Sequence, residues 1–288
     1  MNSEHIASCL HQMKNILFTI AVILLALTPV FAHGELSAQI NQLTQQIKLD
    51  EKNADLYLQR GELYRLNGNA KAALEDYGRT QKLNPKLSEV DLARARLFFD
   101  AAMPEMAKFS LKSFLTSQPN HTEALILLAK TYQSENNLKP ALAGYDQAIS
   151  TAFKLKPDYF IARAEILLKL KRGDEALRGI DEGIAKLGNL ISLQEKAISL
   201  ETELKRWDAT INRVDKLIEQ FHRKETWLVR RAKILLKANR QAEAKITAQK
   251  ALEEINALPD YLRNTAAMEK LKIEAEKMDK GAGTRGKS

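Results

Sequence analysis

The sequence predicts an all-α protein: a solenoid of about six helix–turn–helix repeats followed by a C-terminal capping helix. Two series of small residues carry this prediction. The first series is Gly61, Ala95, Ala129, Ala164, Ala197 and Ala232, with steps of 34, 34, 35, 33 and 35 residues. The second series is Ala73, Ala107, Ala141, Ala176, Ala209 and Ala244, with the same steps. Such a period indicates stacked helical repeats, because packed helices approach closely where their side chains are small.

Large apolar residues form a third series, three positions after each member of the first: Tyr64, Phe98, Tyr132, Leu167, Leu200 and Leu235. We expect them to fill the space between neighbouring repeats. Pro85 and Pro119 end two early repeats, because proline lacks the N–H that continues a helix. Gly68 and Gly173 fall in turns within repeats, where a positive φ is often required.

Two repeats depart from the regular pattern. The third repeat carries extra residues near 150–156. In the fifth repeat the second helix is displaced by one residue, so that Val214 rather than Arg213 takes the apolar slot. These departures concern local geometry and leave the predicted class unchanged.

The repeats resemble the tetratricopeptide repeat (TPR), a helix–turn–helix unit of 34 residues. In the first repeat the resemblance is carried by Tyr57, Arg60, Gly61, Tyr64, Ala73, Tyr77, Thr80 and Pro85. It covers residues 54–258 as about six repeats and implies a right-handed solenoid. It also implies that the first helix of each repeat lines a concave surface. The resemblance further implies a non-enzymatic scaffold or adaptor for protein–protein interactions.

The N-terminal segment is typical of a signal peptide. Lys14 precedes an apolar run over residues 16–27, which is shorter than the ~20 residues that a membrane-spanning helix needs. Val30 and Ala32 take the −3 and −1 positions of a small-residue cleavage site. We therefore expect residues 1–32 to be removed and the protein to be exported, with a periplasmic location. The alternative is an uncleaved N-terminal membrane anchor.

Met13 is an alternative true start. Cys9 lies in the expected leader, so the mature chain would hold no thiol. That composition suits an oxidising compartment.

Flanking segments are expected on both sides of the repeats. A helix within residues 33–53 precedes the TPR array at 54–258. Apolar residues spaced along 261–279 predict an amphipathic capping helix within 259–280. Such a helix covers the open face of the last repeat and presents a polar side to water. Residues 281–288 are predicted to be a disordered basic tail.

The charge of the chain is unevenly distributed. Its 44 basic and 36 acidic residues give a formal net charge of +8. Residues 205–250 hold thirteen basic and five acidic residues, so this block carries the whole excess. The predicted basic patch consists of Arg206, Arg213, Lys216, Arg223, Lys224, Arg230, Arg231, Lys233, Lys237 and Arg240. It indicates either a solvated helical surface or a dock for an anionic envelope polymer, a lipid surface or an acidic protein.

The resemblance also predicts which residues face the concave groove, as three rows along the first helix of each repeat. In the first four repeats these residues are Leu58, Glu62, Arg65, Leu92, Arg96, Phe99, Ile126, Lys130, Gln133, Ile161, Glu165 and Leu168. In the fifth repeat the rows continue through Gln194, Ile198 and Glu201. An apolar row beside a charged row suits an amphipathic helix or an extended peptide. The groove is therefore the predicted binding site for a peptide or helix of a partner protein.

Catalytic chemistry is not predicted. The histidines of the expected mature chain, His33, His121 and His222, are isolated, and the sequence contains no recognised catalytic or phosphate-binding motif. We expect no enzyme activity, no cofactor and no metal site. Nucleic acid is not an expected partner, because no motif that reads it is present and the chain is expected to be exported. An assembly or maturation factor for an exported complex is a further alternative. The partner's identity and the oligomeric state stay open.

Overall fold

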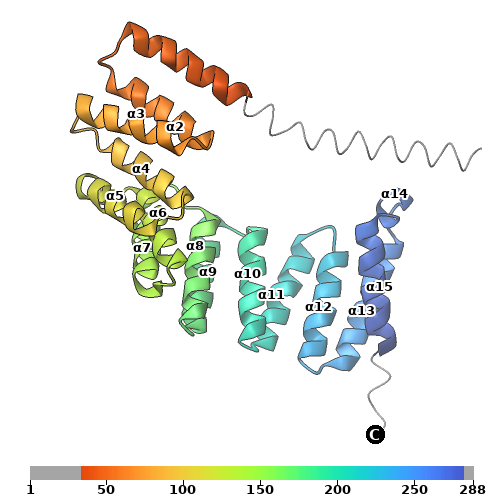
Figure 1. The fold of residues 1–288 in the computed structure, drawn as a ribbon. Helices are drawn as coiled ribbons and strands as arrows, with labels where there is room; N and C mark the ends of the chain where they lie inside the picture. Colours follow the sequence, from red (N-terminus) through yellow and green to blue (C-terminus); the bar gives the residue numbers. More distant parts are fainter. Residues whose placement is uncertain (1–33, 282–288) are drawn as a thin grey trace, which may run out of the picture. The chain divides into compact units, whose positions relative to one another are not determined.

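The computed structural model describes residues 34–281, which form helices joined by short turns and contain no strand (Figure 1). The predicted signal peptide, Cys9, His33 and most of the predicted tail lie outside these residues. The chain divides into two compact units, residues 1–137 and 138–288. The helices of both units confirm the predicted all-α class.

The first unit begins, in its described part, with a helix over residues 34–49. Five helices follow it: α2 (Ala54–Leu66), α3 (Ala70–Leu83), α4 (Glu89–Asp100), α5 (Pro104–Ser117) and α6 (Thr122–Ser134). The Thr44 side chain accepts a hydrogen bond from Arg60 Nη1 at 3.1 Å, which ties this helix to α2.

The second unit holds the remaining helices. They are α7 (Leu138–Thr151), α8 (Pro157–Lys169), α9 (Gly173–Leu187), α10 (Ile191–Glu203), α11 (Trp207–Gln220), α12 (Glu225–Lys237), α13 (Gln241–Asn256), α14 (Asp260–Arg263) and α15 (Ala266–Gly281). The capping helix α15 begins at Ala266 rather than near 261, because Pro259 starts the separate short helix α14. It packs on α13 and α12, and its buried Ala275 and Met278 lie in one apolar cluster with residues of those helices.

Local signals explain where several helices begin and end. Asn69 accepts a hydrogen bond from the Ala72 amide at 3.1 Å and caps the start of α3. Pro104 and Pro157 occupy the first turns of α5 and α8, where the missing N–H does no harm. Helix α3 ends at Leu83, directly before Asn84 and Pro85.

The turns within repeats give the exact period of the array. Positive φ values occur at Gly68, Ala102, Asn136, Lys171, Lys205 and Asn239, with steps of 34, 34, 35, 34 and 34 residues. The expectation of a positive φ was therefore correct for Gly68 and wrong for Gly173. Gly173 is the first residue of α9, and a Cβ there would lie 2.7 Å from Leu204 Cδ2. Close helix approach explains this glycine.

The same period corrects the register of the fifth repeat by one residue. Counted from Lys205, the small slot of α10 falls at Ile198 instead of Ala197, and Ile198 is buried. Glu201, rather than Leu200, then takes the slot of the large apolar series. In α11 Thr210 is buried and Ala209 is exposed, so Thr210 replaces Ala209 in the second series. The predicted burial of Val214 in this helix is confirmed.

This correction changes the groove rows of the fifth repeat. Gln194 and Glu201 are buried against neighbouring helices, and Ile198 fills the small slot. The positions equivalent to the earlier groove rows become Glu195, Ser199 and Thr202. Small-residue matching selected Ala197, which is itself buried, because it is the nearest alanine, whereas the turn at Lys205 makes Ile198 the equivalent residue.

Each unit has an apolar core that runs from one repeat into the next. In the first unit one cluster joins α3, α4 and α5 through Tyr77, Val90, Leu97 and Ala107. In the second unit one cluster consists of buried residues from α12, α13 and α15: Leu228, Val229, Ala232, Ala248, Ala251, Ala275 and Met278. Within residues 34–281 no helix combines the length and the apolar character that a membrane crossing requires.

Candidate functional site

A groove in the first unit brings together predicted and unpredicted residues. It has a volume of about 760 Å³ and lies among the helix 34–49, α2, α4 and the residue before α6. Its lining consists of Gln39, Gln42, Leu43, Gln46, Leu58, Gln59, Glu62, Leu63, Glu89, Leu92, Ala93, Arg96 and His121. We call it the first-unit groove. Four predicted groove residues line it: Leu58, Glu62, Leu92 and Arg96.

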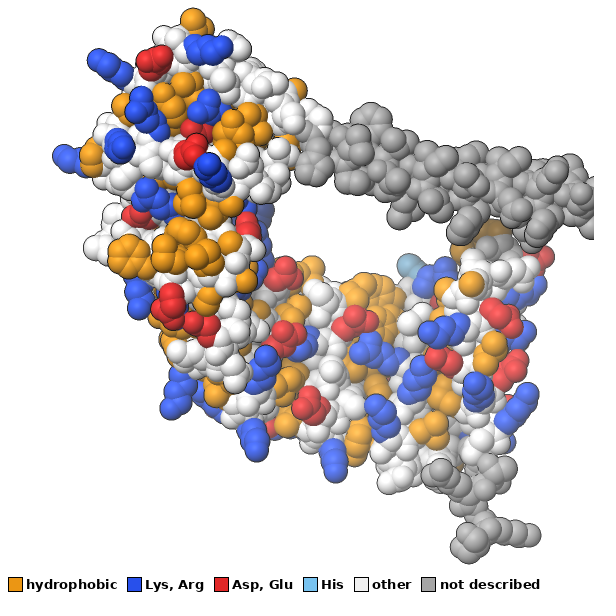
Figure 2. Space-filling model, in the orientation of Figure 1, with side chains coloured by type: hydrophobic (Ala, Val, Ile, Leu, Met, Phe, Trp, Pro, Cys, Tyr) orange, Lys and Arg blue, Asp and Glu red, His pale blue; other side chains and the backbone are white. Residues whose placement is uncertain are grey.

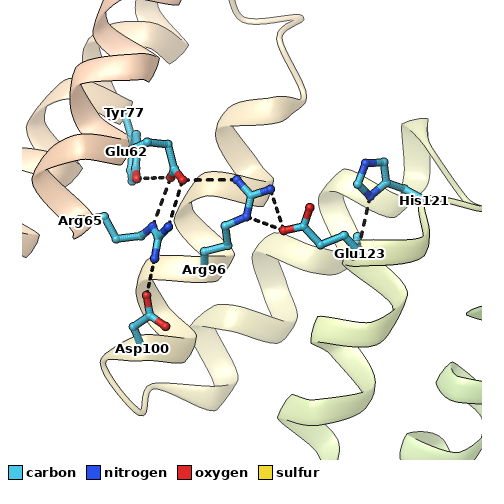
Figure 3. A network of polar contacts seen from close by, with 8 residues as sticks. Glu62, Arg65, Tyr77, Arg96, Asp100, His121 and Glu123 are labelled. Atoms are coloured by element: carbon cyan, nitrogen blue, oxygen red, sulfur yellow. Dashed lines mark hydrogen bonds and ion pairs between the residues drawn. The ribbon is translucent and has the colours of Figure 1, made fainter. Parts of the chain in front are cut away.

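The charged row of this groove forms a closed network (Figure 3). Glu62 accepts hydrogen bonds from the Tyr77 hydroxyl at 2.6 Å, from Arg65 Nη2 at 3.2 Å and from Arg96 Nη1 at 3.4 Å. Arg65 also donates to Asp100 at 2.6 Å, and Arg96 donates to Glu123 at 2.7 Å. The charges at this end of the groove are therefore satisfied by one another.

Burial and the neighbouring carboxylate shift the acid–base properties of Tyr77. Its side chain is fully buried, and burial raises the pKa of its phenol, as does its hydrogen bond to Glu62. Burial alone would lower the pKa of Arg65, but Glu62 and Asp100 raise it above its ordinary value. The neutral Tyr77 hydroxyl thus donates to Glu62 beside the cationic Arg65.

Four glutamines surround the apolar floor of the groove. Gln39, Gln42 and Gln46 come from the helix 34–49, and Gln59 comes from α2. All four are exposed, and none of their side-chain amides hydrogen-bonds to another residue within 34–281. Sequence reasoning missed Gln39, Gln42 and Gln46 because it drew the groove only from the first helices of the repeats. It missed Gln59 because that residue lies outside the three predicted rows of its helix. The spacing of glutamines along 39–46 is the only signal that could have suggested them.

The other predicted groove residues have more varied environments. Phe99 on α4 and Gln133 on α6 are half-buried, Ile126 is buried, and Lys130 is exposed. In the second unit Ile161 and Leu168 are half-buried on α8. His121 accepts a hydrogen bond from the Ala124 amide through Nδ1 and caps α6 (Figure 3).

The second unit has a groove with different chemistry, which we call the second-unit groove. It has a volume of about 400 Å³ and lies among α10, α12 and α15. Its lining consists of Ile198, Ser199, Thr202, Thr226, Val229, Arg230, Lys233, Ile234, Lys237 and Leu271. Three basic and three hydroxyl side chains thus flank an apolar floor, and this lining includes no carboxylate.

The predicted basic patch is largely neutralised by ion pairs. Arg206, Arg213, Arg223, Arg230, Arg231, Lys233 and Arg240 all pair with carboxylates. Several of these carboxylates, such as Asp174, Glu195 and Glu274, lie outside residues 205–250. Lys216, Lys224 and Lys237 have no ion pair within the described chain. Figure 2 accordingly shows blue and red side chains interleaved over the second unit rather than one continuous basic surface.

An arginine directly precedes the small residue of the first helix in four repeats, and two of these arginines, Arg60 and Arg231, join neighbouring helices. Arg60 binds Asp76 at 2.7 Å in its own repeat and Thr44 on the preceding helix. Arg231 binds Asp215 at 2.6 Å and Thr247 at 2.8 Å in the same manner. The hydrogen bond to Asp76 raises the pKa of Arg60. These arginines therefore have a structural role in joining consecutive helices.

No group of His, Cys, Asp and Glu side chains within residues 34–281 could hold a metal ion. The side chains that converge in the two grooves are amides, hydroxyls, paired charges and apolar groups. Such an arrangement can hold a ligand by hydrogen bonds and apolar contact.

Neither a protein-family model nor a curated protein matches the sequence. Solved structures do match. A tetratricopeptide repeat protein from Parabacteroides merdae ATCC 43184 is 19% identical with a TM-score of 0.50, over 84% of this chain and 93% of that chain. A structure of Naa15/Naa10 bound to HypK-THB is 15% identical with a TM-score of 0.50, over 87% of this chain and 44% of that chain.

The MamA protein is 19% identical with a TM-score of 0.50, over 58% of this chain and 90% of that chain. At these identities the likeness concerns the fold. The repeat period, the helix order and these neighbours agree, and the chain has the fold of tetratricopeptide repeat proteins.

Proposed function

We propose that this protein is an interaction scaffold that holds an extended peptide segment of a partner protein in the first-unit groove. The observation that carries this proposal is a set of four glutamine amides around an apolar floor, none of which has a side-chain hydrogen bond within residues 34–281. Each amide offers both a donor and an acceptor, which matches the N–H and C=O of a peptide backbone. Leu43, Leu58 and Leu92 offer contact to alternate apolar side chains.

The charge state of the groove favours a neutral segment. Glu62 already accepts from Tyr77, Arg65 and Arg96, so it has little capacity for a cationic ligand. Arg96 is likewise occupied by Glu62 and Glu123. A strongly charged segment would lose its hydration without gaining a free counter-charge. A neutral, partly apolar peptide avoids this loss.

A structural neighbour with the same fold supports the general idea of protein binding. The Naa15/Naa10 structure contains HypK-THB as a bound partner, according to its own description. This chain covers less than half of that protein, so the analogy extends to the scaffold and not to a particular partner.

The test is affinity capture from a cell-envelope extract, with residues 33–288, the expected mature chain, as bait at low and at moderate salt. The groove variant must leave the core intact. Leu92 and Ile126 are buried, so a glutamate at either position would unfold the repeats, whereas Leu58 is half-buried and can be substituted. We expect Leu58→Glu and the double change Gln42→Ala with Gln59→Ala to release the partner. Gln241→Ala, at an exposed glutamine outside the groove, is the control. If both groove variants still captured the partner, the result would argue against the proposal.

The second-unit groove supports a second candidate, an acidic segment of a partner protein. Lys237, which has no ion pair among the described residues, and the hydroxyls of Ser199 and Thr226 offer donors to a carboxylate, beside an apolar floor. Binding at this groove should weaken steeply with salt, because exposed charges are screened within about 8–10 Å. Lys237→Gln should reduce it, whereas the first-unit variants should not. Salt-insensitive binding would argue against this candidate.

We also propose that the protein is exported and acts in the cell envelope, on the basis of the N-terminal sequence. A role as an assembly factor for an exported complex fits within this proposal. The test is the N-terminal sequence of the protein isolated from cells. A mature N-terminus at His33 is the expected result, and an intact leader on a membrane-bound protein would favour the anchor.

A further inference from the structure

The connections between consecutive repeats form one edge of the second unit. Successive repeat helices run antiparallel, so these connections lie at one end of the helices and the turns within repeats lie at the other (Figure 1). Two hydrogen bonds join neighbouring connections: Asn189 donates to Gln220 at 3.5 Å, and Arg223 Nη2 donates to Met268 Sδ at 3.8 Å. We call this surface the connection edge. It consists of residues 152–158, 188–191, 221–225 and 257–263.

Exposed apolar side chains gather on the connection edge. Within residues 138–281 six large apolar residues are exposed, and four of them belong to this edge: Phe153, Leu190, Ile191 and Tyr261. Single exposed apolar residues are common on protein surfaces, but a gathered set indicates a contact surface. Phe153 is fully exposed. Its connection lies between the turn positions Asn136 and Lys171, which are 35 residues apart where the other steps are 34. The array therefore carries an additional residue where its most exposed aromatic side chain lies.

The opposite edge of the same unit has a different composition. This turn edge consists of residues 170–172, 204–206 and 238–240, and these residues include no exposed large apolar side chain. Its arginines pair with carboxylates of adjacent helix starts: Arg206 with Asp174 at 2.6 Å and Arg240 with Asp208 at 2.9 Å. These ion pairs join each turn to the next. The turn edge thus makes its polar contacts within the unit, whereas the connection edge presents apolar side chains to the solvent.

The charges of the connection edge favour an anionic partner. Its segments contain five basic and three acidic residues. Two of the acidic residues already pair with arginines of the same edge. The third, Asp158, lies in the first turn of α8, where the helix dipole stabilises a carboxylate. Lys154, Lys156 and Lys224 have no ion pair among residues 34–281. The first two follow Phe153 closely in sequence, so the most exposed apolar side chain has cationic neighbours.

We propose that the connection edge docks on an anionic lipid surface, with Phe153 as its main anchor. Apolar side chains on separate connections suit a fluid interface, which adapts to each of them, whereas a protein partner would need a matching pocket for each. Lysine ammonium groups reach anionic headgroups while their alkyl chains lie along the apolar region. Tyr261 suits the boundary between headgroups and acyl chains. Apolar burial and electrostatic attraction together give binding in the plane of the interface.

The experiment is sedimentation with lipid vesicles. The protein is the expected mature chain, residues 33–288, because the apolar run 16–27 would itself bind lipid. This chain contains all of the described residues 34–281. We expect it to sediment with vesicles of phosphatidylglycerol and phosphatidylcholine in equal parts and to bind phosphatidylcholine alone more weakly. Added salt should weaken the binding, because it screens the lysines.

Two variants test the anchor and the charges. Phe153→Ala should weaken vesicle binding about tenfold or more, because the burial of the ring in lipid is lost. The fully exposed ring packs on little of the protein, so this variant should remain folded. Lys154→Gln with Lys156→Gln should weaken binding about fivefold for each lysine. In addition, brominated lipid should quench the fluorescence of Phe153→Trp more strongly than that of the unmodified protein, because the new ring enters the acyl region.

Matched variants away from the edge should bind vesicles normally. Ile246→Ala removes an exposed apolar side chain from α13. Lys171→Gln with Lys205→Gln removes two exposed lysines from the turn edge. The Leu58→Glu variant of the first-unit groove should also bind normally. Failure of this proposal is therefore separable from failure of the proposed peptide groove.

Three results would overturn the proposal: equal binding by Phe153→Ala and the unmodified protein, equal binding to the two kinds of vesicle, or no additional quenching of Phe153→Trp. A fourth would be an envelope protein that the unmodified chain captures and Phe153→Ala releases while no vesicle binds. That result would assign the connection edge to a protein partner.

Discussion

At the scale of single residues, the contact between Gly61 and Tyr77 decides the packing of the first repeat. A Cβ on Gly61 would lie 2.6 Å from Tyr77 Cε1 and 2.8 Å from Cδ1. The Tyr77 ring cannot move away from such a Cβ easily, because it is fully buried and its hydroxyl donates a hydrogen bond to Glu62. This explains why the first repeat keeps glycine where most others have alanine.

Gly61→Ala should therefore destabilise the protein. Alanine gains about 1 kcal/mol in helix propensity, but overpacking against the Tyr77 ring costs about 1–3 kcal/mol. We expect a net loss of about 1 kcal/mol in the free energy of unfolding, measured by urea denaturation. Gly78→Ala is the control, because a Cβ at Gly78 in α3 would meet no atom within 4 Å. It should stabilise the helix; equal gains from both variants would contradict the explanation.

The raised pKa of Tyr77 predicts that the folded protein loses stability at alkaline pH. Its pKa in the folded protein is raised above the unfolded value of 10.0, so the folded state holds the phenol proton more tightly. The resulting stabilisation is complete below pH 10 and is lost as the pH rises, by up to about 1.4 kcal/mol per pH unit. Burial also raises the pKa of Tyr145, to about 12, with the same sign.

The measurement is urea unfolding between pH 8 and pH 11. Tyr77→Phe should flatten the decline above pH 10, and Tyr145→Phe should do so to a smaller extent. Tyr261→Phe is the control, since that side chain is 77% exposed. Parallel pH curves for the unmodified protein and Tyr77→Phe would contradict the assignment.

The groove residues show how much of the site could be predicted from sequence. Helical periodicity correctly placed Leu58, Glu62, Leu92 and Arg96 in the lining of one groove. It could not predict that Glu62 would be saturated by three donors, because Tyr77 and Arg96 come from other helices. It also missed Gln39, Gln42 and Gln46, since nothing in the repeat pattern orients a helix that lies outside the repeats.

At the scale of helices and turns, the left-handed turn position is the most regular feature of the array. Only the first of these turns has glycine, at Gly68, whereas Ala102 and Lys171 adopt φ values of 54° and 60°. A left-handed conformation costs an L-residue about 1–2 kcal/mol. Glycine avoids this cost, but its greater entropy in the unfolded chain offsets part of the advantage. The later turns are therefore locally strained.

Replacement of these residues by glycine should stabilise the protein. We expect Ala102→Gly and Lys171→Gly each to raise the free energy of unfolding by about 0.5–1 kcal/mol. The reciprocal change Gly68→Ala should lower it by a similar amount. Urea denaturation of the three variants tests the argument, and a loss of stability in both glycine variants would contradict it.

The turn series also explains why sequence matching misplaced the fifth repeat. An alanine at 197 and another at 209 satisfy a search for small residues, but counted from the turn at Lys205 the equivalent positions are Ile198 and Thr210. The class and helix order could be predicted, because six repeats share one period. The exact register could not, because it depends on which residue faces the adjoining helix in three dimensions.

At the scale of the whole molecule, we expect each part of the array to have its own local stability. In a repeat protein each helix contacts mainly its neighbours in sequence, so the effect of a substitution decays along the chain. The end of the second unit depends on α15, whose Met278 is buried in one cluster with residues such as Leu228 and Ala251. Helix α15 packs on α13 and α12 and on little else within the described repeats.

Met278→Ala tests this division. Removal of a buried methionine side chain costs about 2–5 kcal/mol, and the loss should fall on the helices that α15 covers. Hydrogen exchange should accelerate in α12, α13 and α15 and stay unchanged in α2 to α5. Lys277→Ala, an exposed change on the same helix, is the control. Faster exchange throughout the chain would instead mean that the protein unfolds as one cooperative body, and ligands of either groove would then stabilise both units together.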